Sequence, residues 1–303
     1  MRDPALIRLL PDGRRLHLHD GPIDLIVEAF GAPECVRAAY RAAAGRFVRV
    51  LDELCGELPL LRQPARAGSP IPVGIVARRM FAAVAPFADS VFITPMAAVA
   101  GAVAEEILGA MISAAPLSRA YVNDGGDIAL HLASDEHFSV ALIDRPDRLS
   151  LFGKAILRAE DRVRGIATSG WRGRSFSLGI ADAVTILAGS AAAADAAATV
   201  IANAVDLPGH AAIARVPARE ISPDSDLGEM RVTRGVGSLQ AREIREALDQ
   251  GLDEANELVS AGLICAAALH LQGETVSTGV LASSKMSLSP LTESSHEGKR
   301  LHA

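Results

Sequence analysis

Apolar residues recur along this chain with two periods, which predict strands and helices in a mixed order. Alternating apolar and polar residues predict strands over 15–19 and 23–27, on either side of an Asp20-Gly21 turn. Spacings of three and four residues predict long helices over 33–58 and 96–113. The same two patterns predict further strands over 119–123, 128–132, 138–143, 165–168, 184–188 and 229–233, and further helices over 75–85, 191–205 and 241–258.

The order of these elements predicts the fold class. Because strands and helices do not alternate regularly, an α+β fold with mixed or antiparallel sheets and flanking helices is favoured over a doubly wound sheet. No strong linker divides the chain, so we expect one domain over residues 1–282. Residues 283–303 are rich in Ser, Glu, Lys and His, have little to bury, and are predicted to be a disordered tail.

Composition and charge exclude several classes of function. The 303 residues are 50% hydrophobic and carry a formal net charge of -6 without a basic cluster, which argues against nucleic-acid binding. No run approaches the ~20 apolar residues of a membrane span, and the first residues lack the apolar stretch of a signal peptide. Three widely spaced cysteines, Cys35, Cys55 and Cys265, form neither a disulfide framework nor a zinc motif. We therefore expect a cytoplasmic protein without membrane or nucleic-acid partners.

One carboxylate stands alone in a run of alanine. Asp195 lies within residues 191–198, and all the remaining residues of that run are alanine. Thr199 follows Asp195 one helical turn later. The two polar groups share one face of a smooth helix that a bulky ligand can approach closely. A carboxylate and a hydroxyl in this arrangement can hold Mg²⁺, which takes few protein ligands and completes its shell with water and phosphate oxygens.

Three more segments precede this helix in a recognisable order. They are the alanine-rich residues 96–105, the glycine turn within 121–127, and the Thr-Ser-Gly turn within 165–170. Together with residues 183–199 they resemble the ApbE superfamily, the FAD:protein FMN transferases, over roughly residues 95–205. The chain looks most like a short branch of that superfamily.

The resemblance implies an α+β fold with two halves around a flavin-nucleotide cleft. Members take FAD, use Mg²⁺ to help break its pyrophosphate, and attach FMN to a Thr or Ser of an acceptor flavoprotein. By resemblance, Asp195 and Thr199 match the metal-binding and catalytic pair. The residues implied beside the nucleotide are Asn123, Gly125, Gly126 and Asp127 in the glycine turn, and Thr168, Ser169 and Gly170 in the cleft turn.

The sequence departs from the superfamily pattern at three places. Ala100-Gly101 stands where a Lys-Gly pair is usual, and Ala104 stands where an Asp is usual. The His-Ile-Ile-Asp-Pro segment is absent, and Arg174 lies where a His is expected. Arginine stays protonated, so Arg174 cannot act as a general base, although it can stabilise phosphate charge. We keep Arg174 as a candidate catalytic residue in that sense.

Plainer interpretations exist for several of these residues. The turn around Gly125 can be an ordinary hairpin, and Thr168 to Gly170 an ordinary cap or turn. Two histidines on one strand, His17 and His19, are expected to be exposed and to bind no metal. The Glu105-Glu106 pair is expected to be a solvated helix face.

Three classes of function follow from the sequence. The first is Mg²⁺-dependent FAD binding with FMN transfer to a protein acceptor. The second is a flavin- or nucleotide-binding module, or a pyrophosphate hydrolase, that has lost transfer chemistry. The third is an assembly protein whose alanine-rich helices pack between copies in a homo-oligomer.

Overall fold

A nine-stranded antiparallel sheet forms the centre of the computed structural model, which describes residues 4–143, 151–279 and 300–302. In spatial order its strands are β1 (Leu6–Leu9), β2 (Leu16–Asp20), β3 (Ile23–Phe30), β4 (Arg119–Asp124), β5 (Asp127–Leu132), β8 (Gly165–Ser169), β9 (Ala183–Ala188), β12 (Ala266–Leu271) and β13 (Glu274–Gly279). Every neighbouring pair runs antiparallel, so tight hairpins can join adjacent strands.

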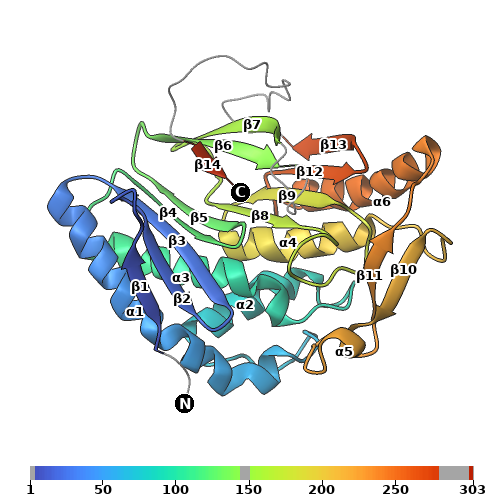
Figure 1. Cartoon of the computed structure of the whole chain (residues 1–303), viewed down its shortest axis with the longest axis horizontal. Coiled ribbons are helices and arrows are strands. Elements are labelled where there is room, and N and C mark those ends of the chain that lie inside the picture. The colour runs from blue at the N-terminus through green and yellow to red at the C-terminus, as the bar shows by residue number, and fades with distance from the viewer. Residues whose placement is uncertain (1–3, 144–150, 280–299, 303) are drawn as a thin grey trace.

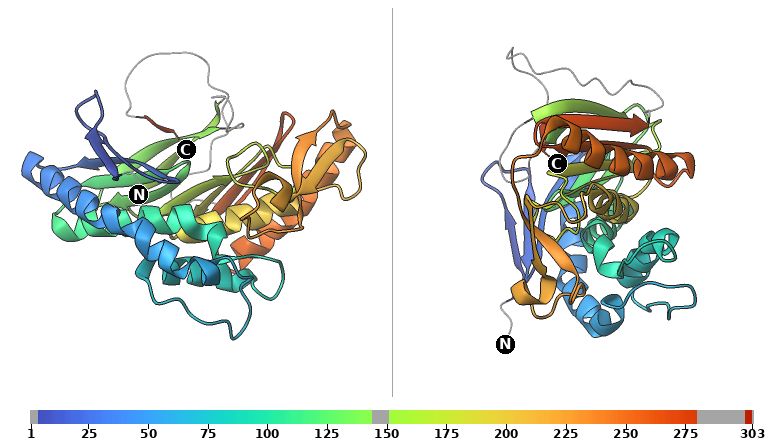
Figure 2. Two further views of the ribbon diagram at one scale, coloured as in Figure 1. Left: turned by 60° about the horizontal axis from the view of Figure 1, so that its bottom comes forward. Right: turned by 90° about the vertical axis from the view of Figure 1, so that its right-hand side faces the viewer.

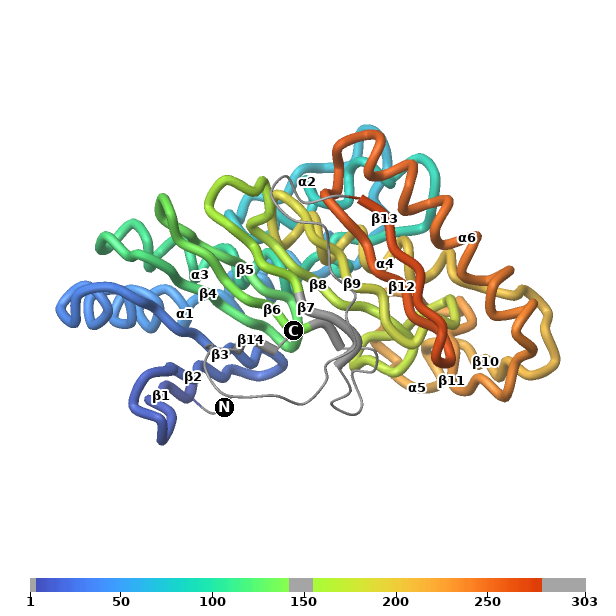
Figure 3. Tube along the Cα trace, turned by 90° about the horizontal axis from the view of Figure 1, so that it is seen from above, coloured from blue at the N-terminus to red at the C-terminus, as the bar shows by residue number. Residues whose placement is uncertain are grey.

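Helices cover one face of this sheet (Figure 1). They are α1 (Pro33–Leu61), α2 (Ile75–Val84), α3 (Val99–Ala114), α4 (Ala191–Ala204) and α6 (Ala241–Ser260), with short 3-10 turns η1 (Ala85–Phe87) and η2 (Pro95–Ala98). The short helix α5 (Ala218–Ile221) lies beside β10 instead. Seen from above, α1 and the N-terminal strands lie at one end of the molecule and α6 at the other (Figure 3). The predicted α+β fold with antiparallel sheets and flanking helices is therefore confirmed.

Two smaller sheets complete the fold. A hairpin of β6 (His137–Ile143) and β7 (Leu151–Arg158) lies on the face of the large sheet opposite the helices (Figure 2). A second hairpin, β10 (Ile213–Pro217) with β11 (Arg231–Val236), lies beside α6. Strand β14 (Arg300–His302) pairs in parallel with β6. The rest of the tail predicted to be disordered lies outside the described residues.

Alternation along the strands builds two separate cores. Val122 and Ala129 point toward the helices and join the main apolar cluster. Their neighbours Tyr121 and Ile128 point the other way and join a second cluster beneath β6 and β7. This follows from the period of two in a strand, where successive side chains leave opposite faces of the sheet. The period also decides on which side of the sheet each candidate site residue lies.

Glycines form the two hairpin turns that the sequence predicts. Gly21 joins β2 to β3 with φ of 57°. Gly125 and Gly126 join β4 to β5 with φ of 64° and 119°. These left-handed conformations cost a glycine little and an L side chain more.

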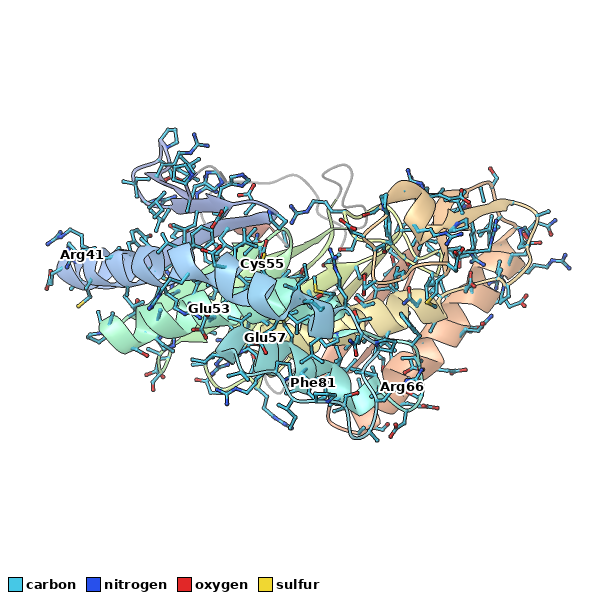
Figure 4. All side chains as sticks on the ribbon, turned by 90° about the horizontal axis from the view of Figure 1, so that it is seen from below. Arg41, Glu53, Cys55, Glu57, Arg66 and Phe81 are labelled. Atoms are coloured by element: carbon cyan, nitrogen blue, oxygen red, sulfur yellow. The ribbon has the colours of Figure 1, made fainter. Side chains whose placement is uncertain are left out.

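The underside of the helical layer is held by a carboxylate from a neighbouring helix. Glu57 on α1 accepts hydrogen bonds from the backbone N–H groups of Val73 and Gly74, both at 2.7 Å, just before α2 begins. Figure 4 shows Glu57 on α1 and Phe81 on α2 from this side. The carboxylate supplies acceptors that the first residues of a helix cannot find within the helix.

One apolar stretch corrects a sequence expectation. Within the described residues, Pro95–Ala114 is long and apolar enough, by length and composition, to cross a membrane, so the expectation that no run approaches that length is wrong. Here α3 packs against α1, α4, β4 and β5. Of this window, 44% is buried within the fold.

Candidate functional site

A pocket of about 480 Å³ opens at the tip of the β4–β5 hairpin, on the sheet face that also carries β6 and β7. This volume lies within the roughly 300–1,000 Å³ range of small-molecule sites. Four residues predicted beside the nucleotide line it, together with the catalytic candidate Arg174. The complete lining is Arg8, Leu10, His17, Asp24, Ile26, Asn123, Gly125, Gly126, Thr168 and Arg174.

The glycine turn brings backbone and a cation together at the pocket mouth. The Arg174 guanidinium lies against Gly125 so closely that a Cβ at that position would overlap it. The Gly126 N–H donates to Asn123 Oδ1 at 2.8 Å, which closes the turn. Arg174 is 67% exposed, and its Nη2 lies 3.9 Å from Asp124 Oδ1. The turn is thus an ordinary hairpin in its bonding, yet it also forms one wall of the pocket.

The opposite wall comes from the N-terminal strands, which the sequence motifs did not mark. Arg8 Nε on β1 donates to His17 Nδ1 on β2 at 3.1 Å. His17 Nε2 lies 2.6 Å from Asp24 Oδ1 on β3. The register places Arg8 directly opposite His17, and His17 opposite Ile26. The expectation that His17 is an exposed strand histidine is wrong, because its side chain is only 13% exposed and both ring nitrogens have partners.

Behind the turn, on the helix side of the sheet, three carboxyl groups shift one another's pKa values. Burial raises the pKa of Asp124 to about 7, against a usual value of 3.8. Burial also raises the pKa of Asp195 to about 7, and the charge of Asp124 adds to that rise. The pKa of Asp127 is raised well above its usual value by burial and then by the charges of Asp195 and Asp124. Each of the three groups therefore resists ionisation, because burial and the neighbouring carboxylates both disfavour its charged form.

Asp195 has a structural partner that the sequence could not show. Its Oδ2 accepts a hydrogen bond at 3.0 Å from the backbone N–H of Gly101, in the first turn of α3. In return, Glu105 on α3 accepts at 2.7 Å from the N–H of Ala192, in the first turn of α4. Each helix thus supplies a carboxylate that caps the start of the other, where free N–H groups and the helix dipole favour negative charge.

The two helices can do this only because they nearly touch. A Cβ at Gly101 would overlap the carbonyl of Ala191 and lie 2.7 Å from Ala192 N. We refer to Gly101, Glu105, Ala192 and Asp195 as the crossed caps of α3 and α4.

The neighbouring acidic residues also differ from expectation. The side chains of Glu105 and Glu106 are 19% and 12% exposed, so the expectation of a solvated helix face is wrong. Arg79 lies 2.9 Å from Glu105 and 3.0 Å from Glu106, and Arg46 lies 2.6 Å from Glu106. This ion-pair network fixes α3 against α1 and α2, which leaves Glu105 held in place to cap α4.

The Thr-Ser-Gly turn contributes unequally to the site. Thr168 lines the pocket, and its Oγ1 lies 2.9 Å from Thr185 Oγ1 on β9. Ser169 is half-buried at the end of β8, and neither it nor Gly170 lines the pocket. A Cβ at Gly170 would lie 2.6 Å from the carbonyl oxygen of Asp182, so this glycine serves a close backbone approach.

The loop after that turn is tied down by a buried carboxylate. Asp182 accepts from Trp171 Nε1 at 3.2 Å, from Arg172 Nε at 2.6 Å and from the Gln272 N–H at 2.7 Å. These bonds give Asp182 a structural role. They also explain Trp171, whose indole is anchored at the nitrogen and covered by the Arg172 guanidinium 4.3 Å from the ring centre.

The donor set for a metal ion is small. Within the described ranges, no three His, Cys, Asp or Glu side chains approach closely enough to hold a metal ion. Asp195 and the half-buried Thr199 share one face of α4, as predicted, with the Asp127 carboxylate as an electrostatic neighbour. Mg²⁺ can be held by so few protein groups, and the mutual repulsion of the carboxylates fits a cation by charge.

Apart from Ser169 and Gly170, which do not line the pocket, the predicted residues gather around one hairpin tip but on two sides of the sheet. Asn123, Thr168 and the glycine turn face the pocket, whereas Asp127 and Asp195 lie on the helix side. Arg174 reaches both, because it lines the pocket and acts electrostatically on Asp124 and Asp127. Sequence reasoning missed Arg8 and Asp24 on the far wall.

Comparison with known proteins places the chain in a family. The family model described as AbpE bacteria matches residues 7–277. A UPF0280 protein from Methanococcoides burtonii is 37% identical over 144 residues, covering 45% of this chain and 54% of the relative. A second, from Methanosphaerula palustris, is 38% identical over 121 residues, covering 37% and 46%. The chain spans about half the length of these curated relatives.

A solved structure shows a weaker likeness. A point mutant of the flavin transferase ApbE from Vibrio cholerae is 13% identical, covers 65% of this chain and 85% of its own, and has a TM-score of 0.28. The family assignment comes from the match over residues 7–277, which spans most of the chain. The chain therefore belongs to the AbpE bacteria family.

Proposed function

We propose that this protein binds FAD at the tip of the β4–β5 hairpin and, with Mg²⁺, transfers FMN to a Ser or Thr of an acceptor protein. The observation that carries the proposal is the pairing of two unlike environments around one turn. Arg8 and Arg174 line the pocket on one side, and coupled carboxylates lie behind the turn on the other. A magnesium pyrophosphate needs both, since cations hold its oxygens and carboxylates hold its metal.

The pocket supports the nucleotide half of the proposal. Its two guanidinium groups can pair with phosphate oxygens by charge-assisted hydrogen bonds. Apolar side chains of Leu10 and Ile26 in the lining can contact a ring. Thr168 adds a hydroxyl on the wall formed by β8.

The carboxylates support the metal half. Asp195 and Thr199 would hold Mg²⁺, with Asp127 beside them. A bound Mg²⁺ supplies a Lewis acid that neutralises charge as the pyrophosphate breaks. Asp195 Oδ2 already accepts from Gly101, so the protein orients this carboxylate before any metal arrives. Arg174 would hold the phosphate and could not remove a proton.

The hydrogen bond from the Gly101 N–H to Asp195 also supports a second function. If Asp195 serves only to cap α3, the protein is a flavin- or nucleotide-binding module, or a hydrolase of nucleotide pyrophosphates, without transfer chemistry. The absence of a third acidic or histidine ligand among the described residues supports this alternative.

Two substitutions at one position separate an enzyme that uses Asp195 as a metal ligand from a binding module in which Asp195 only caps α3. The protein is incubated with FAD and Mg²⁺, binding is followed by flavin absorbance, and AMP release is measured. Asp195→Asn keeps an acceptor for Gly101 but loses the charge, whereas Asp195→Ala loses both. We expect both variants to lose AMP release, and only Asp195→Ala to lose marked stability. FAD binding with no AMP release from the wild type would favour the binding module, and equal release from Asp195→Asn would refute the metal role.

A further inference from the structure

One histidine lines the pocket but has no role in the proposed function. His17 lines the pocket, and its side chain is 13% exposed. His19, two residues along the same strand, is 47% exposed, and the two ring centres lie 6.3 Å apart. The strand thus offers one half-buried imidazole at the site and one exposed imidazole beside it.

The partners of His17 determine which ring nitrogen is basic. Arg8 donates from Nε to Nδ1, and a guanidinium can only donate, so Nδ1 must carry the lone pair. The ring proton is therefore on Nε2, which donates to Asp24 Oδ1 at 2.6 Å. A carboxylate on one imidazole nitrogen and a lone pair on the other is the arrangement of a general base.

We propose that His17 is the general base of this pocket, oriented by Asp24 and covered by Arg8 until a phosphate draws the guanidinium away. The proposal rests on the proposed function, because it needs a phosphate in the pocket. Guanidinium–phosphate bonds are charge-assisted at both partners and stronger than the bond from Arg8 to a neutral imidazole. The other charged or titratable groups near His17 are Asp24, His19 and Arg174.

The chemical step balances with these groups. Nδ1 takes the proton of the acceptor's Ser or Thr hydroxyl, and that oxygen forms a bond to the phosphorus of the FMN half of FAD. The bond from this phosphorus to the bridging oxygen breaks, and AMP leaves with the electron pair. The imidazolium that forms is stabilised by the Asp24 carboxylate. This role restores a proton acceptor to a chain in which Arg174 cannot provide one.

Chemical labelling tests whether Arg8 covers His17, and it needs no turnover of FAD. Diethyl pyrocarbonate acylates an unprotonated imidazole nitrogen, and mass spectrometry separates His17 from His19. In the free protein we expect His17 to react much more slowly than His19, and in Arg8→Ala to react at a rate similar to that of His19. Adding AMP to the wild type should speed the labelling of His17. Slow labelling of His17 in Arg8→Ala would overturn the cover.

Kinetics tests the base. We expect His17→Gln to slow AMP release from FAD about 100-fold or more, with the FAD dissociation constant changed less than threefold. Asp24→Asn should slow it less, and His19→Gln should leave it within twofold. FAD binding with AMP release unchanged in His17→Gln would overturn the inference alone, whereas a wild type that binds no FAD would overturn the proposed function and the base with it.

Discussion

Replacing Gly101 with alanine should separate α3 from α4. A Cβ at this position would overlap the Ala191 carbonyl and lie 2.7 Å from Ala192 N, and both obstacles are backbone. Neither can rotate away as a side-chain tip would, so the two helices must move apart. That movement lengthens the hydrogen bonds that Asp195 and Glu105 make across the contact.

The size of the effect follows from these contacts. Overpacking a close contact costs about 1–3 kcal/mol. Each hydrogen bond to a charged acceptor that is lost costs about 1.5–3 kcal/mol more. Alanine recovers roughly 1 kcal/mol through its helix propensity. With one of the crossed caps broken, we expect Gly101→Ala to lower the free energy of unfolding by roughly 1.5–5 kcal/mol.

Another glycine in the same helix provides a matched control. Gly109 also lies in α3, and a Cβ there would meet nothing within 4 Å. Gly109→Ala should therefore raise the unfolding free energy by about 0.5–1 kcal/mol. Urea unfolding followed by far-UV circular dichroism measures both variants against the wild type. The reasoning fails if Gly101→Ala is as stable as the wild type, or if the two variants shift alike.

Three more outcomes are expected. Asp124→Asn should stabilise the protein at pH 8 but not below pH 4. The pKa of Asp124 is about 7 in the folded protein against a usual 3.8, so its ionisation lowers the free energy of unfolding progressively between these two pH values, by at most ~4 kcal/mol. Urea midpoints at both pH values check this, and an equal gain at both would refute it. Arg174→Gln should weaken FAD binding about tenfold in a fluorescence titration, while the exposed Arg242→Gln leaves it unchanged; similar losses would mean a diffuse charge effect. Glu105→Ala should lower the unfolding free energy by about 1.5–3 kcal/mol, because the Ala192 N–H loses its acceptor, and Glu105→Gln should lower it by clearly less. Equal losses would contradict the role of Glu105 as a cap of α4.

The sequence predicted those elements that carry a local signal. The hairpins at Gly21 and Gly125 were predicted because glycine turns separate alternating strands. Strand β1 was not predicted, because all four of its residues are exposed and show no buried face. Strand β13 likewise has little apolar content to distinguish it from a loop. Strand β12 was not predicted either, although it lies inside the sheet, because its six buried residues show no alternation.

The candidate site was predictable only where its residues lie close in sequence. Asp195 and Thr199 were found by their helical spacing, and Asn123 by its place in a glycine turn. The bond from Gly101 to Asp195 joins residues 94 positions apart, so a cap could not be distinguished from a metal ligand. The pairing of Arg8 with His17 depends on strand register, which single-residue patterns do not fix.

The edge position of β1 has a consequence for how a ligand reaches the pocket. Strand β1 pairs with β2 alone and buries none of its residues, so its local opening should cost far less free energy than opening of the central strands. Since Arg8 lies on this strand, one wall of the pocket belongs to the least anchored part of the sheet. A ligand that engages Arg8 would order this hairpin, and by reciprocity whatever orders the hairpin would tighten the ligand. Affinity at this site would then depend on the order of the sheet edge as well as on the contacts in the pocket.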